Sequence, residues 1–281
     1  SIPRPDEYDH PSLEYQRVVK NWQCGFSEET VRLVRRVYFA MIAEVDAMVG
    51  EILEALDESG LADSTYVIFS SDHGELALEH RQYYKMSLYE PSVRVPLIVR
   101  GPGVRKGAAE DMPVSLVDIY PTLMDMAEWP VPSGLDGYSI MPELRGAPTR
   151  HPGWIISESF ETSCDTGFFM IREGDWKYLV YAGWPPHLFN LKDDPDEVHD
   201  LASARPDVVS RLDAQLRKIV DYEAVDRKVK AYDRASFRQW REERLAAGDY
   251  RALMSRVFSG WDRLTDQDVQ PWTESDEKLI L

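Results

Sequence analysis

Two residues with metal-ligand chemistry, Asp72 and His73, stand shortly after an apolar run in this 281-residue chain. The run, residues 66–69 with the sequence Tyr-Val-Ile-Phe, is β-branched and aromatic and predicts a buried β-strand. Because consecutive strand residues point to opposite faces, both side chains can reach one ion only where the strand has ended, and Gly74 supports an end there. The pair therefore indicates a metal site at the carboxyl end of a strand, although an ordinary strand-end turn could contain the same residues.

A lysine and a second strand follow in a recognisable order. Lys85 lies in the Tyr-Lys-Met-Ser sequence of residues 84–87, and residues 97–100 predict a strand that ends at a Gly-Pro-Gly turn. This order resembles the sulfatase family of the alkaline-phosphatase superfamily, in which Ser-Asp-(His/Asn)-Gly, a lysine and a Val-Pro-Leu-Ile-Val strand occur in succession. Within the family, residues 72–75 and 79–82 are most similar to the arylsulfatase K group and its bacterial relatives.

The resemblance implies an enzyme that hydrolyses sulfate esters with a divalent metal ion and a formylglycine nucleophile. Asp72 and His73 would hold the ion, and Lys85 would neutralise sulfate charge and assist the leaving alkoxide. Ca²⁺ is the expected metal; because His73 stands where many members have Asn and imidazole is a softer ligand, Mn²⁺ is the main alternative, and Mg²⁺ is a further one. His80 and Arg81 are the candidates for binding the rest of the substrate. A solvated Lys85 and a surface ion pair of Arg81 are the competing structural interpretations.

The nucleophile expected from the family is not found in this sequence. It would be a Cys or Ser in the motif Cys/Ser-X-Pro-X-Arg, but Cys24 and Cys164 are not followed by the required proline. The segment Ser1-Ile2-Pro3-Arg4 has its arginine one position too early. The paired aspartates of the family's N-terminal half are missing too. We therefore expect formylglycine, and the remaining metal ligands, to lie in an N-terminal half that this chain does not contain.

Composition excludes some classes of partner. The formal net charge of −17 argues against nucleic acid and against a membrane surface, but a local metal and lysine can still bind an anion. No apolar run is long enough to span a membrane, and two cysteines are too few for a disulfide framework. The absence of an Asn-X-Ser/Thr sequon favours a bacterial cytoplasm or periplasm over a lysosome. A small sulfated molecule is the expected partner, and a homo-oligomer is possible.

The elements that position these residues are predicted from periodicity. Residues 27–59 form the clearest helix, with Ser27 as N-cap and Gly60 after its end, and we expect this helix to pack on the sheet. Prolines in residues 1–26 discourage helix. From His151 the pattern changes to short strands at 154–158, 167–172, 176–181 and 187–191, then to a helix after Leu201, with helical patches at 237–247 and 250–258.

The predicted fold class is α/β: part of an alkaline-phosphatase-like sheet sandwiched by helices, followed by a small α+β subdomain with an antiparallel sheet. The predicted division is 1–150 for the catalytic part and 151–281 for the C-terminal subdomain and tail. Three further features favour structural roles: His10 as a surface-loop histidine, Asp118 as a helix N-cap, and the acidic residues 193–197 as a solvated turn rather than a calcium loop.

Three functions stay open at this point. The first is a sulfuric ester hydrolase that acts on a sulfated sugar or on an aryl or alkyl sulfate. The second is a phosphodiester or phosphonate monoester hydrolase on the same scaffold, which His73 keeps in consideration. The third is a non-catalytic partner chain or fragment that lacks the nucleophile half.

Overall fold

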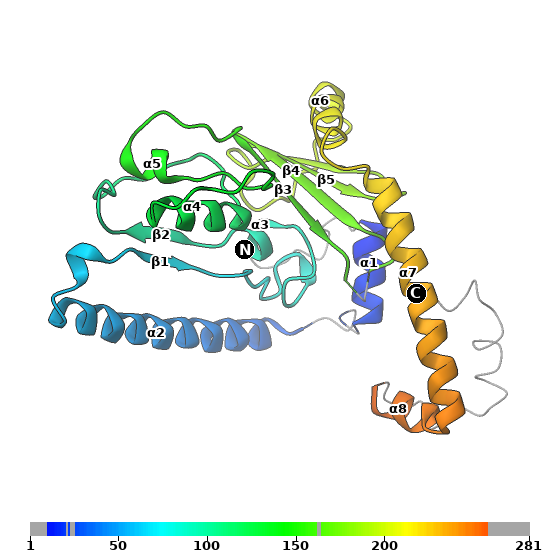
Figure 1. Ribbon diagram of the computed structural model, residues 1–281. Coiled ribbons are helices and arrows are strands. Elements are labelled where there is room, and N and C mark those ends of the chain that lie inside the picture. The colour runs from blue at the N-terminus through cyan, green and yellow to red at the C-terminus, as the bar shows by residue number, and fades with distance from the viewer. Residues whose placement is uncertain (1–9, 21, 23–25, 162–163, 258–281) are drawn as a thin grey trace.

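The computed structural model describes residues 10–20, 22, 26–161 and 164–257 (Figure 1). Residues 1–4 and Cys24, which were compared with the nucleophile motif, lie outside this range, as do residues 258–281. The first element, α1 (Pro11–Val19), corrects the prediction that prolines keep this region irregular. Pro11 stands at the first helical position, where its missing N–H is not needed, and His10 caps the helix by accepting a hydrogen bond from the Ser12 N–H.

The predicted long helix is confirmed as α2 (Glu28–Glu58), and the Ser27 hydroxyl accepts the Thr30 N–H at 3.1 Å. The expected packing of this helix on a sheet is largely wrong, because Val31 is the only buried residue in it. One apolar stripe is open to solvent along the whole helix, with exposed fractions of 46–67%. Its members are Leu33, Val37, Met41, Ile42, Val45, Met48 and Ile52.

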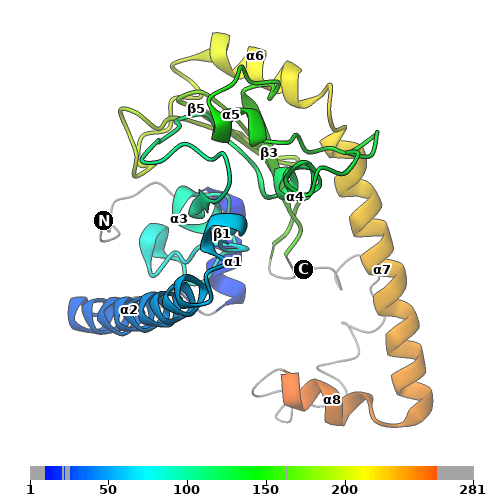
Figure 2. The same cartoon turned by 60° about the vertical axis from the view of Figure 1, so that its left-hand side comes forward.

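Strands β1 (Val67–Ser70) and β2 (Leu97–Arg100) form a two-stranded antiparallel sheet in which Ser70 pairs with Leu97. Asp72 therefore lies at the end of the sheet where β2 begins, opposite to the Gly-Pro-Gly turn. The strands are less buried than predicted, since Phe69 is 37% and Ile98 63% exposed. In Figures 1 and 2, α2 runs along one side of this pair, and α4 (Ile119–Met126) and α5 (Met141–Arg145) lie on the other.

Short elements connect these parts. Three 3₁₀ turns occupy Ala62–Ser64, Glu79–Arg81 and Leu116–Asp118, and the short helix α3 (Glu90–Val93) begins shortly after Lys85.

The C-terminal sheet follows the predicted strands closely. It has the order β3-β4-β5-β6, all antiparallel, with β3 (Trp154–Ser159), β4 (Phe168–Glu173), β5 (Trp176–Tyr181) and β6 (His187–Asn190). Alternate residues of β4 face two different cores. One core contains Phe168 and Met170 and packs against α1 and the loop that carries Lys85, through Leu13, Leu76, Leu88 and Tyr89. The other contains Phe169 and Ile171 and packs against α6 (Pro206–Leu216).

The last helices differ from the prediction. A single helix, α7 (Tyr222–Ala247), replaces the short patch expected at 237–247, and α8 (Tyr250–Val257) follows it. Asp221 caps α7 by accepting the Ala224 N–H, and Gly248 ends it in the left-handed conformation. In both views, α7 leaves the sheet and projects away from the rest of the molecule (Figures 1 and 2).

The architecture is the predicted α/β class: helices around a small central sheet, then a four-stranded antiparallel sheet with its own helices. The division at residue 150 stays a prediction, although β3 begins at Trp154. Within the described ranges, no helix combines the length and apolarity needed to cross a membrane.

Candidate active site at the end of strand β1

The turn after β1 holds Asp72 and His73 in a defined geometry. The Asp72 carboxylate accepts the His73 N–H at 3.0 Å, and the Ser71 hydroxyl donates to the His73 carbonyl at 2.8 Å. Gly74 N–H donates to the Ser92 carbonyl at 2.7 Å. A Cβ on Gly74 would lie 2.0 Å from the Pro91 carbonyl oxygen, so the turn requires glycine for close backbone approach.

Lys85 meets His73 directly, with its Nζ 2.6 Å from His73 Nε2. The other ring nitrogen, Nδ1, lies 2.8 Å from the Gly74 carbonyl oxygen and can reach it only as a donor. This contact assigns the proton to Nδ1 and leaves the Nε2 lone pair for Lys85 or a metal. Asp72 Oδ2 lies 3.4 Å from the same Nε2. The structure thus brings together the three residues for which metal binding and catalysis are predicted.

The charge of the Asp72 carboxylate is favoured by its surroundings. Desolvation acts to raise its pKa, but His73, two backbone N–H groups and Lys85 together place the pKa below the ordinary carboxyl value. Its side chain is 83% exposed. Asp72 therefore presents an ionised oxygen ligand to solvent at neutral pH.

The loop from Glu75 to Tyr84 is held by a residue that the sequence patterns do not single out. One oxygen of Glu75 accepts both the Ala77 N–H at 2.9 Å and the Tyr84 N–H at 2.8 Å. Five non-glycine residues of this loop have positive φ: Ala77, Leu78, His80, Arg81 and Tyr84. Such strained residues persist where the surroundings fix them, and they cluster at functional sites. No local sequence pattern predicts these five positive-φ residues.

His80 and Arg81 lie in this loop, and neither side chain is fully exposed at the surface. The His80 ring is buried and stacks on Tyr89, with centroids 3.7 Å apart and planes 4° from parallel. Arg81 is half-buried. Substrate binding by either residue stays a prediction.

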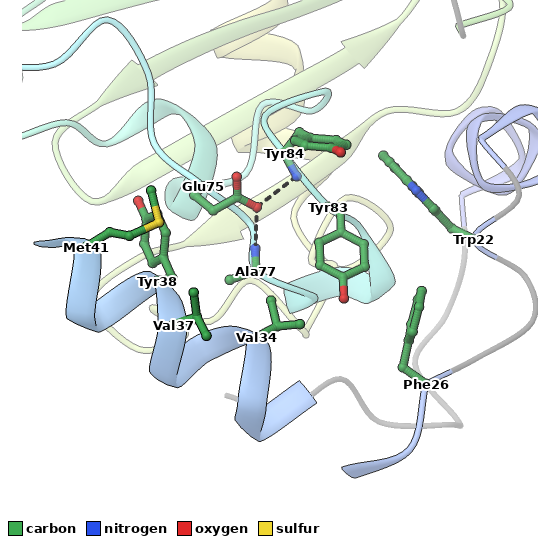
Figure 3. A pocket seen from close by; sticks show the side chains of 10 residues that line it. All are labelled: Trp22, Phe26, Val34, Val37, Tyr38, Met41, Glu75, Ala77, Tyr83 and Tyr84. Atoms are coloured by element: carbon green, nitrogen blue, oxygen red, sulfur yellow. Dashed lines mark hydrogen bonds between the residues drawn. The ribbon is translucent and has the colours of Figure 1, made fainter. Parts of the chain in front are cut away.

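An apolar pocket of about 470 Å³ opens beside the same loop (Figure 3). Aromatic and aliphatic side chains line it, and Phe26 meets Tyr83 edge to face at 5.2 Å. Among the described residues Glu75 is the only carboxylate in the lining, which also includes Trp22, Val34, Val37, Tyr38, Met41, Ala77 and Tyr84. Because Tyr84 precedes Lys85, the pocket adjoins the candidate site along the chain.

The donor set fits a divalent metal but does not complete its coordination. Across the described residues, no group of three or more His, Cys, Asp or Glu side chains converges in a metal-binding arrangement. Asp72 and His73 supply two candidate ligands, and the Nδ1 contact with a carbonyl is the arrangement that commonly orients a metal-binding imidazole. The remaining ligands of such an ion would have to come from residues other than Asp72 and His73.

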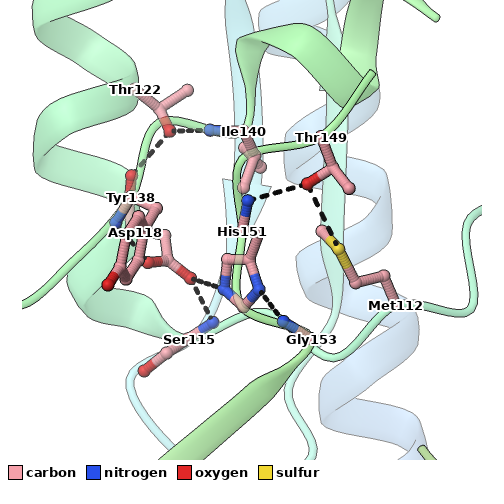
Figure 4. Close-up of polar contacts among 9 residues, drawn as sticks. All are labelled: Met112, Ser115, Asp118, Thr122, Tyr138, Ile140, Thr149, His151 and Gly153. Carbon is pink, nitrogen blue, oxygen red and sulfur yellow. Dashed lines mark hydrogen bonds and ion pairs between the residues drawn. The ribbon is translucent and has the colours of Figure 1, made fainter. Parts of the chain in front are cut away.

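Asp118 is buried and occupies the predicted N-cap position of α4, but its carboxylate caps the preceding 3₁₀ turn in a capping box with Ser115 (Figure 4). It makes no side-chain capping bond to α4. Its carboxylate accepts the Ser115 N–H at 2.7 Å and the Tyr138 N–H at 2.8 Å, and His151 Nε2 lies 3.3 Å away. These contacts join the turn before α4 to the segments at Tyr138 and His151.

A strand that ends in an Asp-His pair next to a lysine, followed by an antiparallel sheet, is the arrangement expected from the resemblance to the alkaline-phosphatase superfamily. Two family models match this chain: Sulfatase over residues 8–129, and N-sulphoglucosamine sulphohydrolase, C-terminal, over residues 78–222. Because the second covers more than half of the chain, the chain belongs to the sulfatase family.

Individual relatives agree with this assignment. Arylsulfatase K of Danio rerio is 45% identical over 83% of this chain and 46% of its own length. The solved structure of a 2-O GAG sulfatase superposes with a TM-score of 0.69 at 26% identity, over 82% of this chain and 54% of that one. A phosphonate monoester hydrolase of Agrobacterium radiobacter has a TM-score of 0.62 at 31% identity, over 70% and 43%. The chain spans about half the length of the curated relatives it matches.

Proposed function

We propose that this chain is the metal- and sulfate-binding part of a sulfuric ester hydrolase. The observation that carries the proposal is the contact between Lys85 and His73, with Asp72 alongside, at the end of β1. An ionised carboxylate, an oriented imidazole and an ammonium group within a few ångströms suit an anionic ester bound next to a cation. Membership of the sulfatase family supports the same chemistry.

The residues of this chain have separate tasks in the proposed reaction. When bound, a divalent ion would polarise the sulfate ester and stabilise the attacking oxygen. Asp72 and His73 would hold that ion, with Nδ1 of His73 fixed by the Gly74 carbonyl. Lys85 would turn from His73 to the sulfate, offset its negative charge and stabilise the departing alkoxide. Ca²⁺ is the metal we propose; Mn²⁺ is the alternative that the His73 imidazole favours, and Mg²⁺ is a further alternative.

The formylglycine nucleophile would come from a part of the enzyme outside this chain. Two features of the described residues support a large missing contact. The apolar stripe of α2 is exposed along its length, and an isolated two-stranded sheet such as β1–β2 is only marginally stable in water. A segment that covers α2 and extends this sheet would complete both, and would bring the nucleophile to Lys85.

A phosphodiester or phosphonate monoester hydrolase is the second candidate. The phosphonate monoester hydrolase of Agrobacterium radiobacter is a structural neighbour, and His73 suits a softer metal than Ca²⁺. This chain is more similar to arylsulfatase K of Danio rerio (45% identical over 83% of the chain) than to this phosphonate monoester hydrolase (31% over 70%). The difference favours a sulfate ester as the substrate.

Intact mass and peptide mapping of the native protein test the proposal. We expect a longer polypeptide, or a co-purifying fragment, with formylglycine in a Cys/Ser-X-Pro-X-Arg peptide. Turnover of 4-nitrophenyl sulfate should then exceed turnover of a phenylphosphonate monoester, and the reverse order would favour the second candidate. A native product that is this chain alone, without bound metal, would refute both enzymes.

Substitution in that native enzyme assigns the roles. Lys85→Ala should lower kcat by about 10²–10³-fold, the usual loss when one charge-stabilising donor is removed. His73→Ala should lower the metal content measured by mass spectrometry. Lys192→Ala, at an exposed turn far along the chain, is the control and should change neither quantity.

A further inference from the structure

Four charged side chains meet between the C-terminal sheet and α3, away from Asp72 and His73. Lys177 of β5 is fully buried, and its Nζ lies 2.9 Å from Glu90 Oε1 and 2.8 Å from Glu197 Oε1. Arg172 of β4 approaches the other oxygen of Glu90 at 3.3 Å. Two cations and two anions therefore balance here, with Lys177 and Glu197 fully buried and Arg172 at the edge of the cluster, 25% exposed. We call these four residues the Lys177 network.

Glu197 ties the network to the backbone of α3. The expected solvated turn at residues 193–197 is wrong for this residue, whose side chain is fully buried. Its Oε2 accepts the N–H of Glu90 at 2.5 Å, and its own backbone has a positive φ of 52°. Burial raises the pKa of the Glu197 carboxyl, while Lys177 and the Glu90 N–H oppose that shift. Glu197 thus combines a strained backbone with a buried carboxylate that binds the first N–H of α3. Strained residues persist where the surroundings fix them, so we infer that α3 is held in one position.

The helix that the network holds is joined to both parts of the candidate site. From α3, the Ser92 hydroxyl donates to the Lys85 carbonyl at 2.7 Å. The Ser92 carbonyl accepts the Gly74 N–H, and the Pro91 carbonyl leaves no room for a Cβ on Gly74. A displacement of α3 would therefore move Lys85 and the Asp72-His73 turn at the same time.

Stability alone does not explain such a network. A well-packed apolar group in place of a buried ion pair is often as stable, so buried charges are weak support for a purely stabilising role. Apolar contacts are also non-directional and would tolerate sliding of α3 over the sheet. Charge pairs at defined distances specify one position of this helix.

We propose that Lys177, through Glu90 and Glu197, is a positioning residue that sets the relative placement of Lys85 and the Asp72-His73 turn. The inference rests on the proposed function of those residues and assigns the C-terminal sheet a part in the reaction. Lys177 would act through its contacts with Glu90 and Glu197, and we assign it no contact with substrate or metal.

Hydrogen exchange measured by mass spectrometry on residues 72–92 tests this proposal without an activity assay. Three variants are informative: Glu90→Gln, Ser92→Ala, and the charge-balanced pair Lys177→Met with Glu197→Gln. We expect peptides containing Gly74 and Lys85 to exchange at least about tenfold faster in each, because α3, which accepts the Gly74 N–H and binds the Lys85 carbonyl, is no longer held in one position. Ser92→Ala removes one hydroxyl and tests the link from α3 to Lys85, whereas Glu90→Gln, which is nearly isosteric, keeps the test of the network decisive if the paired variant does not fold.

Two controls separate positioning from general destabilisation. Val208→Ala, in α6 on the opposite face of the sheet, lowers global stability and should not accelerate residues 72–92 selectively. Lys192→Met removes an exposed lysine and should leave exchange unchanged. If the folded network variants exchange within twofold of the parent at residues 72–92, or no faster than Val208→Ala, the positioning role is overturned.

Metal affinity and kinetics in the native enzyme provide a second readout. Loss of a supporting residue around a metal site typically weakens metal binding by about 10–100-fold, and we expect a loss in this range for the charge-balanced pair. Its urea midpoint should stay closer to that of the parent than the midpoint of Lys177→Met alone. If exchange accelerates but the parent enzyme hydrolyses no sulfate ester, the proposed function fails while the positioning role stands.

Discussion

At the scale of single residues, Cys164 shows that reactivity depends on placement more than on residue type. A cysteine is one source of formylglycine in the family, yet Cys164 lies partly buried beside Gln16, whose amide donates to the sulfur at 3.2 Å. Burial, with the nearby Glu161 carboxylate, raises the pKa of the thiol to about 12. The thiolate is the reactive form, so this cysteine is inert at neutral pH.

Alkylation by iodoacetamide at pH 8 checks this prediction. A thiol with a pKa of about 12 has roughly a thousandth of the thiolate of an unperturbed cysteine at that pH, so Cys164 should react about a thousandfold more slowly than a free thiol. A Cys24→Ser background isolates Cys164, and denaturation in urea should restore a normal rate. Comparable rates in the folded and unfolded chain would contradict the buried placement.

At the scale of elements, two glycines show how the same substitution acts in opposite directions. Gly50 lies inside α2 with open space where an added methyl group would stand, whereas a methyl group on Gly74 would meet the Pro91 carbonyl oxygen at 2.0 Å. Gly50→Ala should stabilise the chain by about 0.5–1 kcal/mol through helix propensity. Gly74→Ala should destabilise it by about 1–3 kcal/mol, since α3 must shift to admit the new atom.

Urea unfolding followed by circular dichroism measures both changes. The two variants should differ by a few kcal/mol in the free energy of unfolding, in the stated order. A Gly74→Ala chain as stable as the parent would mean that α3 is free to move away from the Asp72-His73 turn, and it would weaken the link between α3 and the site.

Local signals account for the elements that were predicted well. Ser27, the apolar spacing and Gly60 delimit α2 within the chain itself, and short apolar and aromatic runs separated by polar turns delimit the four strands of the C-terminal sheet. Local sequence patterns do not predict which groups pair with the buried polar residues. Glu197 meets Lys177 across a sheet, and Lys85 reaches His73 through a loop of strained residues, so both contacts depend on tertiary structure. Resemblance to the family indicated Lys85, but not its contact with His73.

At the scale of the whole molecule, buried histidines join the first helix to the C-terminal sheet. His10, expected on the surface, is buried and stacks on Tyr181 with ring centroids 3.9 Å apart, and its ring meets His187 of β6 edge to face at 4.9 Å. His10 Nε2 donates to the Pro185 carbonyl at 2.8 Å, while Nδ1 accepts the Ser12 N–H. Protonation of Nδ1 would remove the cap of α1.

The two histidines predict a loss of stability in mild acid. Burial lowers the pKa of His187 to about 4 and that of His10 below its ordinary value. Because the unfolded chain binds these protons near pH 6.5, the stabilisation is complete above that pH and falls as the pH drops toward about 4. His187 alone should contribute a loss of about 2 kcal/mol between pH 7 and pH 5, since each pH unit below 6.5 costs about 1.4 kcal/mol.

Urea unfolding of the chain and of His187→Gln at pH 7 and pH 5 isolates this contribution, because every other titrating group is common to both proteins. The substituted chain should lose about 2 kcal/mol less than the parent over this range. His199→Gln, which removes an exposed imidazole, should follow the parent. Equal losses in the parent and in His187→Gln would show that His187 is protonated in the folded state, which its place between His10 and Phe189 does not permit without movement of α1 from the sheet.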